Sequence, residues 1–451
     1  MMSPLTQETV FENLPQMAVL LDEARAGEIF ERRMIAAAGC KVRQCRIDHV
    51  KLRPEKNCLV TYGLDLIEQT TGVVTELTLN LLAYPSGESA NQFAKARQRT
   101  TVRTPIGEGL FHLPELESVV RVFPNDRKLS GLPALADVHR LKSKILPEVV
   151  RKSFGDEWAI GELTIEPVHY AAERSYTVRA DLELINQSKG ESERRTIFGK
   201  TYCEGEAAVV WRLTRELRQN EACQRGQLLI PQPLAFQPEI ETIWQSGLAG
   251  KTLNEVDPES AELPALMESA ARSVAALHRA SIQSAQQVNQ SDLIGKLEDA
   301  KKLIGRVRPS MQSKLHSLVG RLVASSGNPG ERPNVTLHGD LHLKNFFATG
   351  NRVALIDLDN LALGDPLRDV GSFIAALHYR ELLDGKSCRV NMSNFVRAYR
   401  DGVNWEVADF ALDWHTAAAL VYERAYRCIT RLKNGRMAII DDLVDLADQL
   451  F

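Results

Sequence analysis

Hydrophobic and polar residues follow two different patterns along this chain of 451 residues. In the first half, apolar and polar residues alternate along 46–50 and 59–67, which is typical of strands with one buried face. In the second half, apolar positions recur with helical spacing, first along 263–280 and then almost continuously after Phe373. The later helices are expected at 374–383, 392–401, 407–431 and 437–450. Strands followed by helices predict an α+β fold class.

The strand-rich half contains an internal repeat. Residues 50–90 and 168–208 align without a gap at a constant shift of 118 positions, with 13 identities in 41 pairs. The matches fall on strand positions and turn glycines, so we infer a duplicated unit of strand, tight connection, strand, hairpin, strand and helix. The alternative is that two unrelated β-rich units share only their strand patterning.

A β-hairpin is expected in the second half. The apolar runs 346–348 and 353–356 flank a turn signal centred on Gly350. A hairpin returns the chain to its start, so Asn345 before the first strand and Asp357 after the second would lie side by side. Their side chains offer the oxygen donors that Mg²⁺ prefers.

Two further carboxylates accompany this pair. Asp340 lies five residues before Asn345, where it can orient a hydroxyl nucleophile and accept its proton. Asp359 lies two residues after Asp357, on the same face if the strand continues, and is a second metal ligand or a brace.

The residues around this hairpin carry a family resemblance. The motifs are His338-Gly339-Asp340-x-x-x-x-Asn345, then Ile356-Asp357-x-Asp359, then Gly364-Asp365-Pro366-x-x-Asp369. Together they resemble the aminoglycoside phosphotransferase and choline-kinase-like branch of the protein-kinase-like superfamily. The resemblance implies a bilobal fold, with an antiparallel-sheet small lobe and a mainly helical large lobe. It also implies ATP and Mg²⁺ as cofactors.

The resemblance assigns roles to the loop residues. Asp340 would be the catalytic base, and Asn345 and Asp357 would be Mg²⁺ ligands. His338 is grouped with the catalytic residues, although such a histidine commonly holds the backbone by hydrogen bonds. Asp369 is expected to be a buried brace of the catalytic loop.

The second copy of the repeat would be the nucleotide-binding small lobe. Its strand 196–202 places Lys200 where the family's strand lysine grips the α- and β-phosphates. The next helix, about 206–223, should supply the glutamate that pairs with this lysine; Glu216 is our choice and Glu206 is the rival.

Two other small-lobe segments are candidates for nucleotide contact. The connection 170–176 contains no glycine, but the backbone N–H groups of Arg174 and Ser175 could meet phosphate oxygens; the alternative is a plain tight turn. The strand 241–246 leads into an interlobe hinge, so Trp244 and Gln245 are expected near the adenine, although a tryptophan such as Trp244 is more often simply part of the core.

The first copy is expected to lack a nucleotide site. Leu82 stands at the position equivalent to Lys200, and a leucine cannot hold phosphate. We therefore expect one ATP per chain. The expected domains are a degenerate small-lobe-like unit at 1–140, the nucleotide-binding lobe at 141–247 and the catalytic lobe at 248–451.

The composition and charge of the chain give no indication of a nucleic-acid or membrane partner. The formal net charge of −3 gives no electrostatic footprint for nucleic acid, and no apolar run approaches a membrane span. The N-terminus lacks the pattern of a secretory signal, and seven scattered cysteines form no Cys-x-x-Cys pair. A cytoplasmic protein with reduced thiols is expected.

The acceptor is expected to be a small hydroxyl compound: a sugar, an amino alcohol or an aminoglycoside-like molecule. The helical half should shape its pocket. Candidate contacts there are Trp414, His415, Glu423, Arg424, Tyr426 and Arg427, each of which also fits a core or solvated position. The competing function is a catalytically weak binding or regulatory module with the kinase shape.

Overall fold

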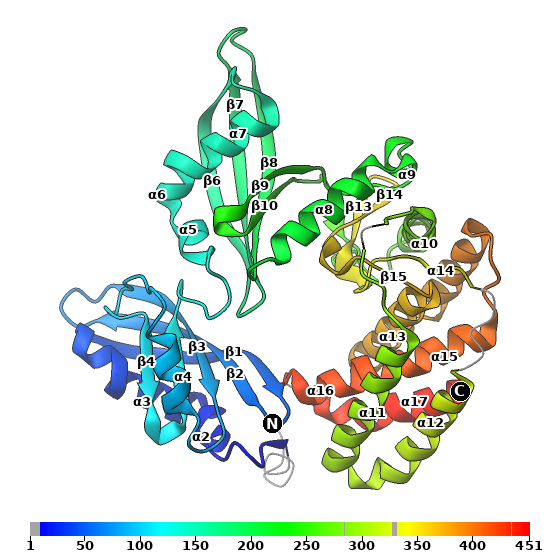
Figure 1. Ribbon diagram of the computed structural model, residues 1–451, viewed down its shortest axis with the longest axis horizontal. Helices are drawn as coiled ribbons and strands as arrows, with labels where there is room; N and C mark the ends of the chain where they lie inside the picture. Colours follow the sequence, from blue (N-terminus) through cyan, green and yellow to red (C-terminus); the bar gives the residue numbers. More distant parts are fainter. Residues whose placement is uncertain (1–9, 284, 327–331, 434) are drawn as a thin grey trace.

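The computed structural model describes residues 10–283, 285–326, 332–433 and 435–451. Two antiparallel sheets and a helical body are arranged around a central region (Figure 1). The N-terminal sheet contacts the helical body at one end, and the second sheet joins it at the other. Among the described helices, none combines the length and the apolar character needed to cross a bilayer.

The two sheets have the same topology. Their strand orders are β1-β2-β3-β5-β4 and β6-β7-β8-β10-β9. The first sheet comprises β1 (Cys40–Arg53), β2 (Asn57–Glu68), β3 (Val74–Ala83), β4 (Leu110–Leu113) and β5 (Ser118–Val122). The second comprises β6 (Trp158–Ala171), β7 (Ser175–Asn186), β8 (Ser192–Tyr202), β9 (Pro233–Gln237) and β10 (Thr242–Ser246).

The backbone details of the two sheets also match, which confirms the duplication. In the turn between the first two strands of each sheet, a glutamate, Glu55 or Glu173, has a positive φ near 60°. A second matched pair, Glu117 and Glu241, has positive φ just before the last strand. Because non-glycine residues rarely adopt this conformation, its recurrence at equivalent positions indicates a common origin of the two units.

Helices cover both sheets. The N-terminal sheet is accompanied by α2 (Met17–Leu20), α3 (Glu23–Phe30) and α4 (Ser89–Ala96). The second sheet is accompanied on one face by α5 (Leu132–Ala136), α6 (Val138–Arg140) and α7 (Leu146–Phe154), and apolar residues of α5 and α7 share a core with Trp244. Its other face meets α8 (Glu206–Gln219) through Tyr202 and Ile243, and α9 (Glu221–Gln224) follows.

The large lobe is mainly helical, as the resemblance implies. Its helices are α10 (Leu263–Arg279), α11 (Gln290–Val307), α12 (Gln312–Ser325), α13 (Leu367–Asp384), α14 (Arg389–Gly402), α15 (Asp409–Ala419), α16 (Tyr426–Thr430) and α17 (Ile440–Leu450). Five short strands complete it: β11 (Lys251–Thr252), β12 (Val335–Leu337), β13 (Phe346–Thr349), β14 (Arg352–Leu355) and β15 (Ala362–Gly364).

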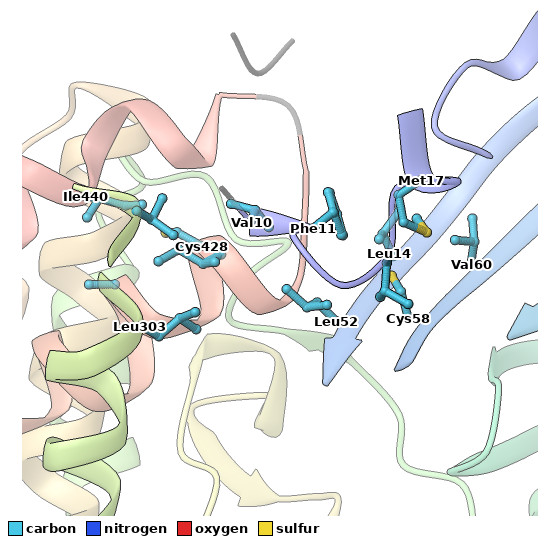
Figure 2. Close-up of a cluster of buried hydrophobic side chains, with 14 of the residues drawn as sticks. Val10, Phe11, Leu14, Met17, Leu52, Cys58, Val60, Leu303, Cys428 and Ile440 are labelled. Carbon is cyan, nitrogen blue, oxygen red and sulfur yellow. The ribbon is translucent and has the colours of Figure 1, made fainter. Parts of the chain in front are cut away.

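A single hydrophobic core joins the N-terminal sheet to the helical lobe. Figure 2 shows Val10 and Phe11 between Leu52 of β1 and Cys428 of α16, with Ile440 beyond. Each fully buried large apolar side chain stabilises such a contact by about 1.5–3 kcal/mol. The N-terminal sheet is therefore held against the large lobe, and its β1–β2 turn lies close to the catalytic loop.

Candidate active site

The expected hairpin is present and brings the two proposed metal ligands together. Strands β13 and β14 pair antiparallel, with Phe346 opposite Leu355. The N–H of Ile356 donates to the carbonyl oxygen of Asn345 at 3.0 Å. Asn345 and Asp357 are therefore neighbours at the open end of the hairpin. Asp357 has a φ of 60°, and such strained non-glycine residues are concentrated at functional sites.

Lys200 of β8 reaches across from the small lobe to this point. Its Nζ lies 2.6 Å from Oδ1 of Asp357 and 2.6 Å from Oδ2 of Asp359. The Tyr202 hydroxyl donates to the other oxygen of Asp359 at 2.8 Å. One lysine thus bridges both carboxylates, and Tyr202 is a site residue that the motifs did not indicate.

The pKa values of this cluster follow from burial and mutual charge. Burial raises the pKa of the Asp357 carboxyl, but the Lys200 ammonium outweighs burial and lowers that pKa to about 2. For Asp359, burial and the adjacent Asp357 charge raise the pKa against the opposing effect of Lys200. Burial lowers the pKa of Lys200, but the two carboxylates reverse this and raise it. Lys200 is therefore a charged ammonium in this site.

The catalytic loop presents Asp340 beside the hairpin. The amide nitrogen of Asn345 donates to the backbone carbonyl of Asp340 at 2.9 Å, which leaves the Asn345 side-chain oxygen for a cation. His342 lies beside the Asp340 carboxylate, with Nε2 3.9 Å from Oδ2, and burial lowers the pKa of this histidine against the opposing effect of Asp340. Gly339 has a φ of +80°, and a Cβ there would lie 2.4 Å from the carbonyl oxygen of Asn360. Only glycine fits this turn.

His338 supports this loop and does not reach the cavity, so its grouping with the catalytic residues is corrected. It is 0% exposed, and its Nε2 lies 3.0 Å from the carbonyl oxygen of Ile356. Asp369 accepts the backbone N–H groups of His338 and Gly339 at 2.6 and 3.0 Å, and its carboxylate also contacts His278. Asp369 is the buried brace that the sequence predicted.

The expected pair of Lys200 with Glu216 is not the arrangement in the structure. Both ion pairs of Lys200 within the described residues go to Asp357 and Asp359. Glu216, on α8, accepts the backbone N–H of Gln283 at 2.6 Å. The helical spacing placed Glu216 near the sheet-facing edge of α8, but the aspartates offer Lys200 two closer carboxylates.

Trp244 belongs to the core and does not face the nucleotide side, which corrects its assignment to the adenine site. Its side chain is 0% exposed, and its Nε1 donates to Gln237 at 2.9 Å. It packs over Gly199, the residue before Lys200, where an added Cβ would lie 2.7 Å from the ring. Because adjacent strand residues point to opposite faces, Trp244 and Lys200 are on different sides of the sheet. Gln245, opposite Phe198, lies on the Lys200 side.

The β6–β7 turn is fixed by the N-terminal unit. The N–H of Arg174 donates to the Ala171 carbonyl at 3.0 Å, so this amide is used within the turn and not for phosphate. The carboxylate of Glu173 forms ion pairs with Arg53 and Arg127, and only 2% of its side chain is exposed. Ser175 is buried at the start of β7. The alternative of a plain tight turn therefore holds for the Arg174 amide, and a phosphate contact through the Ser175 amide stays a prediction.

The donor set fits a hard divalent cation. The carboxylates of Asp357 and Asp359 converge on the Lys200 ammonium, and Asn345 lies at the same end of the hairpin, paired through its backbone with Ile356. No cluster of three or more histidine, cysteine, aspartate or glutamate side chains suited to a metal occurs among the described residues. The two aspartates and the amide would therefore rely on nucleotide phosphates and water for the remaining ligands, as Mg²⁺ commonly does.

The acceptor candidates in the helical half divide into two groups. Trp414 and His415 are structural, because the Trp414 indole donates to Leu322 at 2.9 Å and His415 lies 3.4 Å from Asp365. The others surround or line one cavity beside the catalytic loop. They are Glu423, Tyr426 and Arg427 in its wall, with Arg424 paired to Glu423 at 3.5 Å.

The antiparallel-sheet lobe, the helical lobe and the residues between them agree with the bilobal arrangement that the resemblance implies. Residues 206–408 match the model of the phosphotransferase enzyme family (APH), which confirms the resemblance carried by the catalytic motifs. A comparison of the sequence with curated proteins gives no match.

The chain is similar to solved structures that include two aminoglycoside phosphotransferases and a choline/ethanolamine kinase family protein. A thermostable mutant of aminoglycoside phosphotransferase APH(4)-Ia is 16% identical, covering 67% of this chain and 97% of its own, with a TM-score of 0.45. ADP-bound APH(2'')-Ib is 14% identical, covering 68% and 99%, with a TM-score of 0.43. A choline/ethanolamine kinase family protein from Mesorhizobium loti is 16% identical, covering 64% and 91%, with a TM-score of 0.43.

Proposed function

We propose that this protein is an ATP-dependent small-molecule kinase that transfers the γ-phosphoryl group to a hydroxyl of its acceptor. The observation that supports this most is the pair of ion contacts from Lys200 to Asp357 and Asp359. These contacts lie at the end of the hairpin that begins after Asn345, and Asn345 is hydrogen-bonded to Asp340 of the preceding loop. Phosphoryl transfer requires positioned positive charge and a base for the acceptor, and these residues provide both.

In the proposed reaction, the acceptor oxygen forms a bond to the γ-phosphorus while the bond to the β,γ-bridging oxygen breaks. The electron pair of the broken bond leaves with ADP. Asp340 orients the acceptor hydroxyl and takes its proton, since the described residues place no hydrogen-bond donor on its carboxylate. Lys200 binds the α- and β-phosphates, and the Arg174 side chain adds positive charge nearby.

Asn345, Asp357 and Asp359 would hold Mg²⁺, which supplies charge neutralisation on the phosphates when bound. Before nucleotide binds, Lys200 neutralises the same aspartates. The cluster therefore avoids an uncompensated pair of carboxylates in either state. The catalytic residues by themselves are compatible with a sugar, an amino alcohol or an aminoglycoside-like acceptor.

A screen of hydroxyl compounds for stimulated ADP formation tests the proposal. Asp340→Asn should reduce the stimulated rate by about 10²- to 10⁴-fold while nucleotide affinity is retained, because the carboxylate acts on the acceptor. Asp442→Asn, on the exposed face of α17, is the matched control and should behave like the parent. An Asp340→Asn enzyme close to the parent rate would refute the base assignment. Absence of any stimulated turnover would favour the binding-module function.

A further inference from the structure

A large cavity lies where the acceptor must enter. Its volume is about 850 Å³, and Gly339, which precedes Asp340, contributes to its wall. The end of β1 and the β1–β2 turn that follows it, together residues 51–56, close one side. Helices α11, α13 and α16 form the other sides. The N-terminal unit thus supplies part of a cavity that opens beside the catalytic loop.

The cavity is strongly basic although the protein carries a net negative charge. Nine lysines and arginines line it, against four carboxylates. Two of these carboxylates already have partners within the protein. Asp369 accepts the catalytic-loop N–H groups, and Glu423 pairs with Arg427 at 3.0 Å. The excess positive charge is therefore local and is not cancelled by the surrounding acids.

Several of the cations have no counter-ion within the protein. Among the described residues, no carboxylate forms an ion pair with the six cations Lys51, Lys296, Lys302, Arg306, Arg368 or Arg431. The Nε of Arg306 is buried and also lacks a hydrogen-bond partner in the described part of the chain. Because a buried donor without an acceptor is costly, this Arg306 nitrogen is suited to an acceptor atom of a bound ligand.

The electrostatic environment agrees with the geometry. Burial, followed by Arg427 and Arg174, lowers the pKa of Arg431 to about 10, and Asp340 acts in the opposite direction. Burial lowers the pKa of Lys51 and of Lys296, and neighbouring arginines add to this effect. The cations repel one another, so a bound anion would relieve this repulsion.

We infer that the acceptor is a hydroxyl compound that already carries a phosphate or carboxylate group, with this anionic group held by the cations of α11, α13 and the β1–β2 turn. The inference rests on the proposed function, which supplies the phosphoryl transfer to the hydroxyl at Asp340. A cationic amino alcohol or aminoglycoside is disfavoured, because its ammonium groups would face Lys296, Lys302 and Arg431.

The test uses series of hydroxyl compounds that share a carbon skeleton and carry different charged groups. Glucose, glucosamine, gluconate and glucose 6-phosphate form one such series, and ribose with ribose 5-phosphate, and glycerol with glycerate and glycerol 3-phosphate, form others. ADP formation by the full chain is measured with each compound. The inference predicts stimulation by anionic members and little by neutral or cationic members of the same series. Stimulation confined to neutral or cationic members would overturn the inference and leave the kinase function standing.

Variants locate the effect in the cavity. Lys302→Gln should raise the KM for the stimulating anion about 10- to 100-fold, the range for losing a charge-assisted contact, with a smaller change in kcat. Lys301→Gln is the control on the same helix, since Lys301 pairs with Glu298 at 2.5 Å and does not line the cavity. Equal KM values for parent and Lys302→Gln would contradict the inference.

A binding experiment separates this inference from the proposed function. Inorganic phosphate is titrated calorimetrically into the protein with a saturating non-hydrolysable ATP analogue and Mg²⁺. The inference predicts binding that Lys302→Gln weakens and Lys301→Gln does not. That result without turnover of any hydroxyl compound would sustain the anion site and refute the kinase. Phosphate binding that is absent, or that is unchanged in Lys302→Gln, together with no turnover of anionic compounds, would refute the anion site.

Discussion

Replacing Lys200 by methionine should destabilise the unliganded protein, tighten its binding of Mg²⁺ in the absence of nucleotide and lower turnover. The ammonium of Lys200 is 2.6 Å from both Asp357 and Asp359, and 19% of its side chain is exposed. Removing one partner of such a buried group leaves uncompensated charge, which typically costs about 3–5 kcal/mol. Partial protonation of Asp359 and residual solvent access reduce the effect, so we expect about 3 kcal/mol. For a lobe of roughly 200 residues this corresponds to a melting temperature lower by about 6–12 °C.

The same variant should bind Mg²⁺ more tightly in the absence of nucleotide. In the parent, the cation must displace the Lys200 ammonium from the two aspartates, whereas in Lys200→Met the aspartates are available. Turnover with ATP should fall, because the phosphates lose their lysine. Differential scanning calorimetry with and without Mg²⁺, together with steady-state kinetics, measures all three quantities. Lys189→Met, at an exposed lysine of the β7–β8 hairpin, is the control.

The stability of the folded protein should also depend on pH through the Asp357 carboxyl. The Asp357 pKa is about 2 in the folded protein, below its ordinary value of 3.8. A lowered folded pKa contributes stability that is present above the unfolded pKa and is lost as pH falls through the folded one. The contribution should disappear between about pH 4 and pH 2 in the parent, and this pH dependence should shrink in Lys200→Met. Identical melting temperatures and Mg²⁺ affinities in parent and variant would show that the lysine bridge does not form.

Three other predictions concern the metal, the nucleotide and the N-terminal unit. Asp357→Ala should abolish Mg²⁺-dependent ATP binding and Asn345→Ala should weaken it less, because Asp357 supplies the charge; undiminished calorimetric affinity in Asp357→Ala would move the role to Asp359. Nucleotide titration should give one ATP per chain, and a stoichiometry near two would contradict a nucleotide-free first copy. Glu173→Gln should destabilise the chain by about 3 kcal/mol in thermal unfolding, because Arg53 and Arg127 lose a buried partner; an unchanged transition, as expected for the exposed control Glu166→Gln, would refute this.

The sequence predicted the parts of the site that depend on local structure. The spacing between Asn345 and Asp357 contains two short apolar runs and a glycine turn, and such a segment has one compact solution, the hairpin observed. The repeat likewise predicted two related sheets, because matched strand and turn residues encode matched backbone conformations. Regular helical spacing predicted the helices after residue 373, although α13 begins at Leu367, about seven residues before its expected start.

Contacts between distant segments were beyond the sequence patterns. The partner of Lys200 depends on how closely β8 approaches the short 3₁₀ turn at 358–360 that follows β14. The helical spacing of α8 carries no information about that distance. The face of Trp244 depends on the register of β10 against β8, which places it over Gly199. His338 illustrates a third limit, because a motif histidine looks the same whether it reacts or supports the backbone until its burial is known.

The N-terminal copy of the repeat lines the basic cavity, and we propose that this is its role in place of nucleotide binding. In the first copy, Leu82 replaces the lysine and shares a hydrophobic cluster with Ala172 from the β6–β7 turn of the second copy. The face that would receive ATP is thus filled by protein. The β1–β2 turn is the first copy's equivalent of the β6–β7 turn, and it carries Lys51 and Arg53 into the cavity wall. We propose that equivalent turns of the two copies serve different parts of the reaction site, with the β1–β2 turn on the side of the acceptor. Arg53 also forms an ion pair with Glu173. This contact joins the β1–β2 turn to the β6–β7 turn and fixes the position of one turn relative to the other.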